Sequence, residues 1–261
     1  MRNIPLDTVD HLDRAVLPLG TDYPAGRVLD WHEHRRAQFL YGATGVMVVE
    51  TADGSWTVPP ERAVLIPAVT PHRVRMLGVS TCSLYVEPGA VPWWPARCTV
   101  VDVPPLLREL LLAAVDFGPD YSPSGREGTL VELLLYEIAA RAPLPFHVAL
   151  PVSADLAEVC RAYLEAPDAG VTNAEWAART ARSERALTRR FREETGESPA
   201  VWRSRARLLA AVPLLRTASV TEAAGRLGYA SPAAFTAAFT RAFGLPPSRF
   251  RGTAPAARPT P

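Results

Sequence analysis

The 261-residue chain is 48% hydrophobic and 21% charged, which is typical of a soluble protein and leaves room for two domains. No apolar run approaches the roughly 20 residues that span a bilayer, and three scattered cysteines build no disulfide framework, so we expect a cytoplasmic protein without a membrane segment. Residues 1–150 hold 12 Arg against 17 acidic residues, a net charge of −5, whereas residues 151–261 hold 16 Arg against 10, a net charge of +6. The basic half is the candidate for binding a polyanion.

The first hundred residues predict a β-barrel or β-sandwich. Short apolar or alternating runs recur about every ten residues and are broken by Gly, Pro and Asp. The runs occupy residues 45–49, 55–58, 63–66 and 82–86. Asp53-Gly54, between the first two, predicts a tight hairpin. We expect one domain over residues 1–101.

Three histidines of this domain form a pattern that suits a metal ion. His32 and His34 are two residues apart, so period-two spacing places both on one face of a strand. His72, from a later strand, would complete the set, and neutral imidazoles suit Zn, Fe, Ni or Cu. The same residues would equally line a metal-free effector pocket or serve the fold alone, and the three interpretations stay open. The candidate pocket walls are Trp31, Tyr41 and Trp56.

The spacing around these histidines resembles the two motifs of the cupin family. His32-x-His34-x-x-x-Gln38 followed by Gly45 matches the first motif, and Pro67-x-x-x-x-His72 matches the second. Gln38 stands where cupins carry a glutamate, and a neutral amide is a weaker ligand. The resemblance implies a cupin-like barrel that senses a small molecule or a metal. The implied pocket and metal ligands are His32, His34, Gln38 and His72.

Two helices follow the predicted barrel. Residues 104–115 and 127–141 are rich in Leu and Ala at helical spacing, and residues 118–125 form a loop between them. The apolar stripe of the second helix comprises Leu130, Leu133, Leu134 and Ile138. We interpret residues 102–141 as a connector that packs on the barrel or forms a dimer interface, so a homodimer stays open.

The remaining chain divides into a linker, a helical domain and a tail. Residues 142–152 begin with two prolines in three positions and predict a stiff, extended linker. Residues 153–252 are helical in pattern throughout. Residues 253–261 are rich in Pro and Ala and predict a disordered tail.

The strongest signal in the chain is an internal repeat. Residues 183–191 recur as residues 231–239 at an offset of 48, and upstream the offset falls to 47, as one inserted residue in the turn of the second copy would produce. Each copy begins with a capping box, at Thr172-x-x-Glu175 and at Ser219-x-x-Glu222. A short capped helix, a tight turn and a second helix predict a helix-turn-helix unit in each copy.

The second helix of each copy has one buried and one free face. Ser183 and Ser231 are its N-caps. The pairs Leu187/Phe191 and Phe235/Phe239, at i and i+4, bury one side. The opposite side of the first copy carries Arg185, Thr188, Arg189 and Arg192. A short helix with projecting arginines fits a major groove about 12 Å wide, so double-stranded DNA is the expected partner.

From Leu156 to Arg251 the chain resembles the DNA-binding domain of the AraC/XylS family. The segments that close the two units, residues 196–203 and 244–251, carry the resemblance together with the repeat. The resemblance implies two units joined by one long helix, here residues 199–216, that enter successive major grooves. The implied DNA contacts are Arg185, Thr188, Arg189 and Arg192 in the first unit, and Ser231, Ala233, Thr236, Ala237 and Arg241 in the second.

The two predicted contact surfaces differ in chemistry. Arginine can bond bidentately to guanine, whereas Ala and the Thr methyl meet only thymine methyls or the backbone. We therefore expect the first unit to read bases and the second mainly to clamp the DNA backbone. Pro213 lies inside the expected joining helix, where an interior proline costs about 3 kcal/mol and kinks the axis, which leaves the relative setting of the units undetermined.

Together these features predict a two-domain α+β protein, with a cupin-like barrel and helices followed by an all-α domain of two helix-turn-helix units. We interpret it as a ligand-responsive, sequence-specific transcription regulator without enzymatic activity. The resemblance implies an activator, which would have RNA polymerase as a partner. The alternative is a metal-dependent cupin enzyme tethered to a DNA-binding module, which needs an acid or base beside an open metal position, and Glu33 points away by strand alternation.

Overall fold

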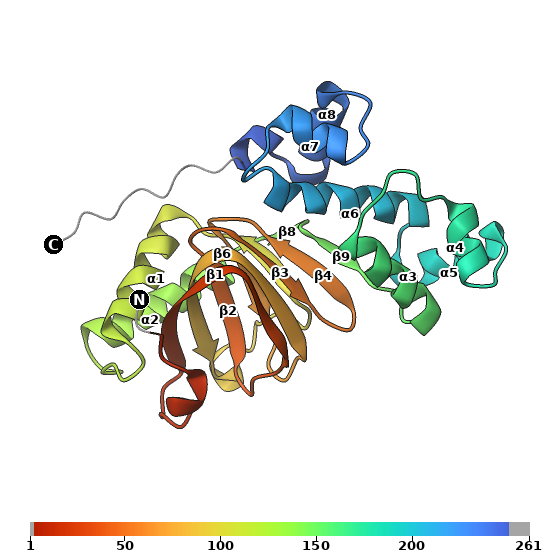
Figure 1. Ribbon diagram of the computed structural model, residues 1–261. Helices are drawn as coiled ribbons and strands as arrows, with labels where there is room; N and C mark the ends of the chain where they lie inside the picture. The colour runs from red at the N-terminus through yellow and green to blue at the C-terminus, as the bar shows by residue number, and fades with distance from the viewer. Residues whose placement is uncertain (1–2, 251–261) are drawn as a thin grey trace. The chain divides into compact units, whose positions relative to one another are not determined.

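The computed structural model describes residues 3–250, which form two compact units (Figure 1). The first unit comprises residues 3–51 and 56–144, and the second comprises residues 52–55 and 145–250. Among the described residues, no helix combines the length and apolarity needed to cross a membrane. The predicted tail, residues 253–261, lies outside the described part of the chain.

The first unit is a curled antiparallel sheet, followed by helices. Its strands are β1 (Val16–His32), β2 (Ala37–Gly42), β3 (Val46–Glu50), β4 (Gly54–Val58), β5 (Arg62–Ile66), β6 (His72–Val86), β7 (Thr99–Asp102) and β8 (Pro143–Leu144). Neighbours run in the order β8-β7-β5-β2-β6-β3-β4, and β1 pairs with β6 as well. The barrel-like fold is confirmed, and β3 and β4 form the hairpin predicted around Asp53-Gly54.

The pairing of β1 with β6 governs the candidate histidine site. These long strands run antiparallel from Val16 opposite Val86 to His32 opposite His72. Gly45, between β2 and β3, has φ +67°, and a Cβ there would lie 2.2 Å from the carbonyl oxygen of Gly78. Only glycine therefore permits this close approach of the turn to β6.

Helices α1 (Pro105–Phe117) and α2 (Arg126–Ala139) cover one face of the sheet. Leu107 and Leu111 of α1 share a core cluster with Leu134 and Ile138 of α2, and the sheet adds Phe39 and Tyr41 from β2. Leu133, expected in the buried stripe of α2, is instead 42% exposed. The cause is the helical period, because Val131, Leu134 and Ile138 lie on the face that meets the sheet, and Leu133 falls outside it.

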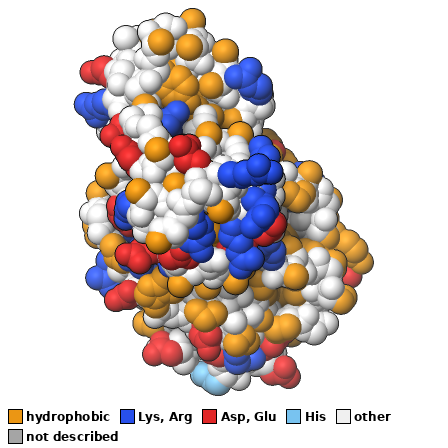
Figure 2. All heavy atoms as spheres, turned by 90° about the vertical axis from the view of Figure 1, so that its right-hand side faces the viewer, with side chains coloured by type: hydrophobic (Ala, Val, Ile, Leu, Met, Phe, Trp, Pro, Cys, Tyr) orange, Lys and Arg blue, Asp and Glu red, His pale blue; other side chains and the backbone are white. Residues whose placement is uncertain are grey.

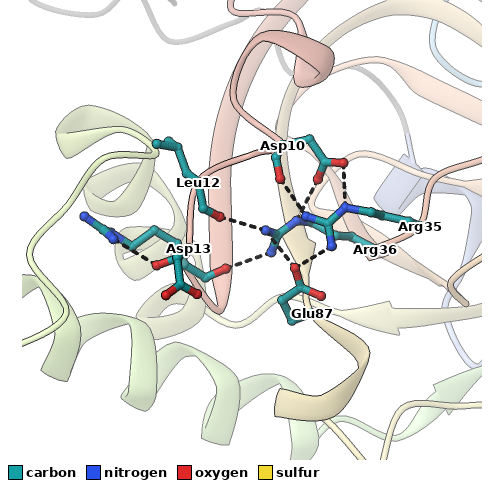
Figure 3. Close-up of polar contacts among 7 residues, drawn as sticks. Asp10, Leu12, Asp13, Arg35, Arg36 and Glu87 are labelled. Carbon is teal, nitrogen blue, oxygen red and sulfur yellow. Dashed lines mark hydrogen bonds and ion pairs between the residues drawn. The ribbon is translucent and has the colours of Figure 1, made fainter.

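A buried ion cluster holds the N-terminal segment on the sheet (Figure 3). The Arg36 guanidinium is 1% exposed, and it pairs with Asp10 and Glu87, each at 2.8 Å. It also donates to the carbonyl oxygens of Leu12 at 3.1 Å and Arg14 at 2.8 Å. Burial would raise the pKa of Asp10, but bonds from Arg35 and Arg36 outweigh it and hold that pKa below its ordinary value. A buried charge is tolerated here because every side of it is paired.

The second unit is mainly helical. Its helices are α3 (Ala154–Glu165), α4 (Asn173–Arg179), α5 (Glu184–Thr195), α6 (Pro199–Leu214), α7 (Val220–Arg226) and α8 (Pro232–Phe243), and it includes the short strand β9 (His147–Ala149) and the 3-10 turns η3 (Pro247–Phe250). The first unit also contains the single turns η1 (Leu6–Thr8) and η2 (Pro88–Ala90). Residues 142–152, predicted as extended, hold the strands β8 and β9.

The joining helix α6 ends two residues before the predicted boundary. It runs over 16 residues, about 24 Å along its axis at 1.5 Å per residue. Pro213 is its penultimate residue, so the backbone donor that proline lacks is missing only from the last turn. Pro213 does lie inside the joining helix, as predicted, but in its final turn, so most of the helix precedes it.

Candidate nucleic-acid interface and sensor site

Both helix-turn-helix units begin with the predicted capping box. In α4 the Glu175 N–H donates to Thr172 Oγ1 at 3.2 Å, and the Thr172 N–H donates to Glu175 Oε2 at 3.1 Å. In α7 the matching distances between Ser219 and Glu222 are 3.2 and 2.7 Å. Each box satisfies two backbone donors that a helix start leaves without partners.

The turns of the two units differ by the one residue that the repeat predicted. The first turn comprises residues 180–182, and the second comprises residues 227–230. Ala181 and Gly228 hold equivalent positions, with φ +50° and +72°. At Gly228 a Cβ would lie 2.4 Å from the Cβ of Ala169, so this position excludes side chains by contact as well as by backbone conformation.

The helices α5 and α8 are built alike. The hydroxyls of Ser183 and Ser231 accept from the N–H of the third residue of each helix, at 3.2 and 3.1 Å. A left-handed glycine, Gly196 or Gly244, ends each helix. The four predicted core side chains are fully buried: Leu187, Phe191, Phe235 and Phe239. Each helix is thereby fixed by one face and leaves the other free.

The aromatic cores beneath these helices are separate. In the first unit Trp176 lies 5.8 Å from both Phe191 and Trp202 between ring centroids. In the second unit Phe239 lies 5.6 Å from Phe235 and 5.2 Å from Phe250. Aromatic pairs at these separations stabilise each unit beyond simple burial.

The free face of α5 is basic. Arg185, Arg189 and Arg192 are exposed, and Thr188 between them is half-buried. The Arg189 side chain is 77% exposed, and its ion pair with Glu193 is long, at 3.8 Å. An exposed pair of that length contributes little, so the guanidinium is free to meet another partner. Basic side chains gather in the middle of Figure 2, on the end of the molecule where Figure 1 labels α4 and α5.

The free face of α8 is small and mostly apolar. Ala233 and Ala237 are exposed, Thr236 is half-buried, and Arg241 stands one turn beyond Ala237. A shallow hollow in this face is lined by Pro232, Ala233, Thr236, Ala237, Thr240 and Arg241. The helix carries no carboxylate, so nothing on it repels a phosphate.

The three predicted histidines of the first unit come together. The His32 ring centroid lies 4.3 Å from that of His72 and 5.0 Å from that of His34, and the third pair is 5.5 Å apart. One ring nitrogen of each lies within 4.8 Å of the others. The expected shared strand face is wrong, however. β1 ends at His32, so His34 reaches the cluster from the following loop, and cross-strand pairing brings His72 beside His32.

Hydrogen bonds determine the tautomers of His32 and His72, and burial determines the protonation state of His34 and His72. Nδ1 of His72 lies 2.7 Å from the carbonyl oxygen of Thr70, and Nδ1 of His32 lies 2.5 Å from that of Asp30. A carbonyl only accepts, so both Nδ1 atoms carry hydrogen. Burial lowers the pKa of His72 to about 4, as it does that of His34 with help from the neighbouring histidines. These two rings are therefore neutral near pH 7.

Two further polar residues, Tyr85 beside His34 and Ser83 beside Gln38, were not predicted. The amide nitrogen of Gln38 donates to Tyr85 Oη at 3.1 Å and lies 3.4 Å from Ser83 Oγ. The Tyr85 ring lies 5.0 Å from that of His34. Strand alternation in residues 82–86 places Ser83 and Tyr85 on one face, but the pairing of β6 with β2 decides what that face meets.

The three aromatic residues predicted to line the effector pocket, Trp31, Tyr41 and Trp56, lie in different environments. Tyr41 belongs to the core beneath α1 and α2, on the face of β2 opposite Gln38, because an odd spacing puts two residues on opposite sides. Trp31 is 51% exposed, and Arg73 lies over its ring at 5.9 Å. Trp56 is buried in β4. Tyr41 is therefore a core residue, and Trp31 is the one wall candidate that adjoins a site histidine in sequence and remains exposed.

Two capped helix-turn-helix units, one with a basic free helix face, and a barrel with a polar histidine cluster define a DNA-binding protein with a sensor domain. The model of the AraC-like ligand binding domain matches residues 16–188, and a helix-turn-helix domain model matches residues 176–253. The chain is 28% identical over 221 residues to the HTH-type transcriptional regulator NimR of Escherichia coli strain K12, covering 84% of this chain and 81% of that protein. The chain belongs to the AraC family and is a ligand-responsive, DNA-binding transcription regulator. The enzyme alternative finds no support in these matches.

Two solved structures are among those to which this chain is similar. An apo ToxT variant from Vibrio cholerae has TM-score 0.39 and 10% identity, and the match covers 91% of this chain and 97% of that one. The DNA-binding domain of AdpA, solved in complex with a target DNA, has TM-score 0.35 and 40% identity over 38% of this chain and 91% of that one. Both scores are below 0.5, and the family assignment rests on the sequence matches.

Proposed function

We propose that this regulator recognises its DNA site mainly through α5, while α8 holds the adjacent DNA backbone. One observation carries the proposal: equivalent faces of two equally constructed helices expose Arg185 and Arg189 in α5 but Ala233 and Ala237 in α8. A guanidinium can bond to guanine O6 and N7 together, and each such pair contributes about 1–3 kcal/mol of discrimination. An alanine methyl offers no hydrogen bond to any base.

The role of α5 follows from how its arginines are held. Arg185 stands in the first turn and Arg189 one turn later, on the side opposite the buried Leu187 and Phe191. Thr188 lies between them and presents a hydroxyl and a methyl. Arg192 continues the face toward the helix end, where it would meet a phosphate. The burial of the other side fixes the rotation of the helix, so these side chains meet the groove together.

We assign α8 a role in holding the DNA backbone because Ala233, Thr236 and Ala237 offer no bidentate bonds to bases. Arg241 supplies a cation for a phosphate, and the start of the helix after Ser231 offers the Ala233 N–H and a favourable dipole. The small side chains of Ala233, Thr236 and Ala237 let the helix approach the groove closely. This unit then adds affinity and fixes the register of the first unit on the DNA.

Further parts of the function follow from the family and the sensor domain. We propose that the first unit binds its effector at the histidine cluster and that the bound state changes affinity for the operator. We also propose that the chain activates transcription through contact with RNA polymerase, acts in the cytoplasm and catalyses no reaction. Transcription assays on the selected operator with purified RNA polymerase, with and without the chain, test the sign of regulation.

Binding-site selection with the purified full-length chain tests the central claim. We expect a site of two adjacent segments, one with strongly preferred guanines and one with weak preferences. Thr236→Ala should leave the preferences of the first segment intact. A site without preferred bases contradicts the proposal, and so does a Thr236→Ala variant that loses all discrimination.

The clamp is tested by the salt dependence of operator binding. Arg241→Ala should weaken binding to all sequences equally and reduce the slope of log K against log salt by about 0.9, as loss of one phosphate contact requires. A change in base preference with an unchanged slope would make Arg241 a base-reading residue instead.

A homodimer is proposed through α2, because Leu133 and Tyr136 lie exposed on one side of this helix, at 42% and 68%. Tyr136→Glu should shift the mass of the chain in light scattering from dimer to monomer. A monomeric wild-type chain at the concentrations used for operator binding contradicts the dimer and leaves the division between α5 and α8 untouched.

A further inference from the structure

We infer that His32, His34 and His72 together bind one divalent transition-metal ion, and that this ion is a ligand to which the regulator responds. The inference deepens the proposed function, since it names the chemical class of the effector. It concerns only residues of the first unit. DNA recognition by the metal-free chain can therefore be measured separately.

The geometry of the three rings is close to that of a metal site. Their nearest donor nitrogens lie within 4.8 Å of one another. Imidazole ligands stand about 2.0–2.1 Å from zinc, which places the donors of a tetrahedral site about 3.4 Å apart. Small rotations of the His32 side chain, at the end of β1, and of the His34 side chain, in the following loop, would bring the donor nitrogens to this separation. The backbone of β6 would stay in place.

The hydrogen bonds around the cluster are those that metal ligands need. His72 and His32 each donate Nδ1–H to a backbone carbonyl, which orients the ring and leaves Nε2 with its lone pair. His72 is 1% exposed, and its Nε2 is buried with no hydrogen-bond partner. A buried acceptor without a partner keeps its full desolvation penalty, and coordination of a metal ion would offset that penalty.

The turn before His72 joins the two histidine-bearing segments. Val69 has φ +52°, an unfavourable conformation for a β-branched residue, yet its N–H donates to the carbonyl oxygen of His34 at 2.7 Å. One residue later, the Thr70 carbonyl accepts from His72. A strained turn thus ties the loop of His34 to the ring of His72.

The donor set selects the class of metal. Three imidazoles and no carboxylate favour Zn, Ni, Co or Cu over the oxygen-seeking Mg and Ca. Gln38 directs its amide nitrogen toward Tyr85, and its Oε1 is buried without a partner, so it is at most a neutral fourth donor. Three protein ligands leave a coordination position open, and the neutral donors leave the charge of the ion uncompensated. A water or an anionic small molecule would fit that position.

Cobalt titration of the full-length chain tests the site. The chain is treated with a chelator, titrated with Co²⁺ and followed by visible absorption, then by displacement with Zn²⁺. We expect one Co²⁺ ion per chain. Its visible absorption should show the intense bands of nitrogen-coordinated cobalt with few ligands. His72→Ala should weaken binding by more than about 100-fold, since changes outside the ligand set alone cost 10- to 100-fold. His11→Ala, a histidine outside the cluster, is the matched control and should bind as the wild type does.

Operator binding provides the second readout. Adding Zn²⁺ should change the affinity of the wild-type and His11→Ala chains for the selected operator by at least fivefold, and should leave His72→Ala unchanged. Circular dichroism and metal-free operator binding show whether His72→Ala is folded, and His32→Ala serves as a second ligand variant. Failure of the wild-type chain to bind cobalt, or binding by both ligand variants as tight as that of the wild type, overturns the metal site. Tight metal binding without any change in operator affinity overturns the effector role. Sequence-specific binding by the metal-free chain keeps the proposed DNA function standing in either case.

Discussion

The first helix-turn-helix unit caps α4 with Thr172 and Glu175 and buries Leu187 and Phe191 beneath α5. The second unit does the same with Ser219 and Glu222, and with Phe235 and Phe239. Their free faces nevertheless differ: α5 presents three exposed arginines, whereas α8 presents alanines and a single arginine. Caps and buried faces are constrained by the fold, whereas a face that meets only solvent or DNA can differ without cost to the fold.

The difference has a consequence for how two similar units share one site. A guanidinium distinguishes guanine from other bases, and a methyl distinguishes little. Two equally selective units would each contribute to specificity, but here specificity is concentrated in α5. The following changes test that inequality, from the largest expected effect to the smallest.

Arg189→Ala should cost about 1–3 kcal/mol, or about 5- to 150-fold, in operator affinity, because a bidentate base contact is lost. Preference at one base pair should disappear. Arg190→Ala is the matched control: the same helix loses the same charge, but Arg190 is paired with Glu194 and bonded to Ser153. Binding to selected and scrambled duplexes measures both variants. Equal loss of discrimination in the two would mean that α5 contributes charge alone.

Thr172→Ala and Ser219→Ala should each reduce the free energy of unfolding by about 1 kcal/mol, since each removes one side of a capping box. Urea denaturation of the full chain measures the change. Equal effects would show that the units are equivalent in structure although unequal in recognition. A loss confined to one variant would show that the structural equivalence fails as well.

Replacing thymine by deoxyuridine in the second segment of the selected site should weaken binding two- to fourfold. The change removes the methyl group that Ala233, Thr236 and Ala237 can contact, and one buried methyl contributes about 0.8 kcal/mol at most. The same replacement in the first segment, outside any guanine contact, is the control. A tenfold loss in the second segment would make α8 a base reader in its own right.

Acid should weaken the second capping box. Backbone and side-chain bonds from Ser219 hold the pKa of Glu222 below its ordinary value. The stability contributed by this carboxylate is therefore present above its unfolded pKa of 4.5 and is lost as pH falls through the lowered value. Glu222→Gln should flatten this part of the stability profile below about pH 5. An unchanged profile would remove Glu222 from the cap.

Much of the second unit could be predicted because its signals are local. A capping box spans four residues, a recognition helix buries residues four apart, and an inserted turn residue shifts a repeat by one. Each of these features depends only on residues within a few positions of one another. Sequence patterns alone therefore identify the helix caps Thr172, Ser183, Ser219 and Ser231. Family membership followed from the same segments.

The first unit depended on distant pairings, and there the local patterns were insufficient. The sequence placed His32 and His34 on one strand, but β1 ends at His32. It offered Tyr41 as a pocket wall, but the helices α1 and α2 cover that face of β2. Tyr85 joined the histidine cluster only through the pairing of β6 with β2, more than 40 residues away in the chain.

In the second unit the sequence by itself determined where α4, α5, α7 and α8 begin, which faces of α5 and α8 are buried and which chemistry those two helices present. These properties arise within one or two helical turns. Only the tertiary structure decided that His32 and His72 are cross-strand partners, that Arg36 is buried among Asp10 and Glu87, and that Pro213 falls in the last turn of α6. Strand register and the burial of a charge depend on residues far apart in the chain, and no local pattern specifies them.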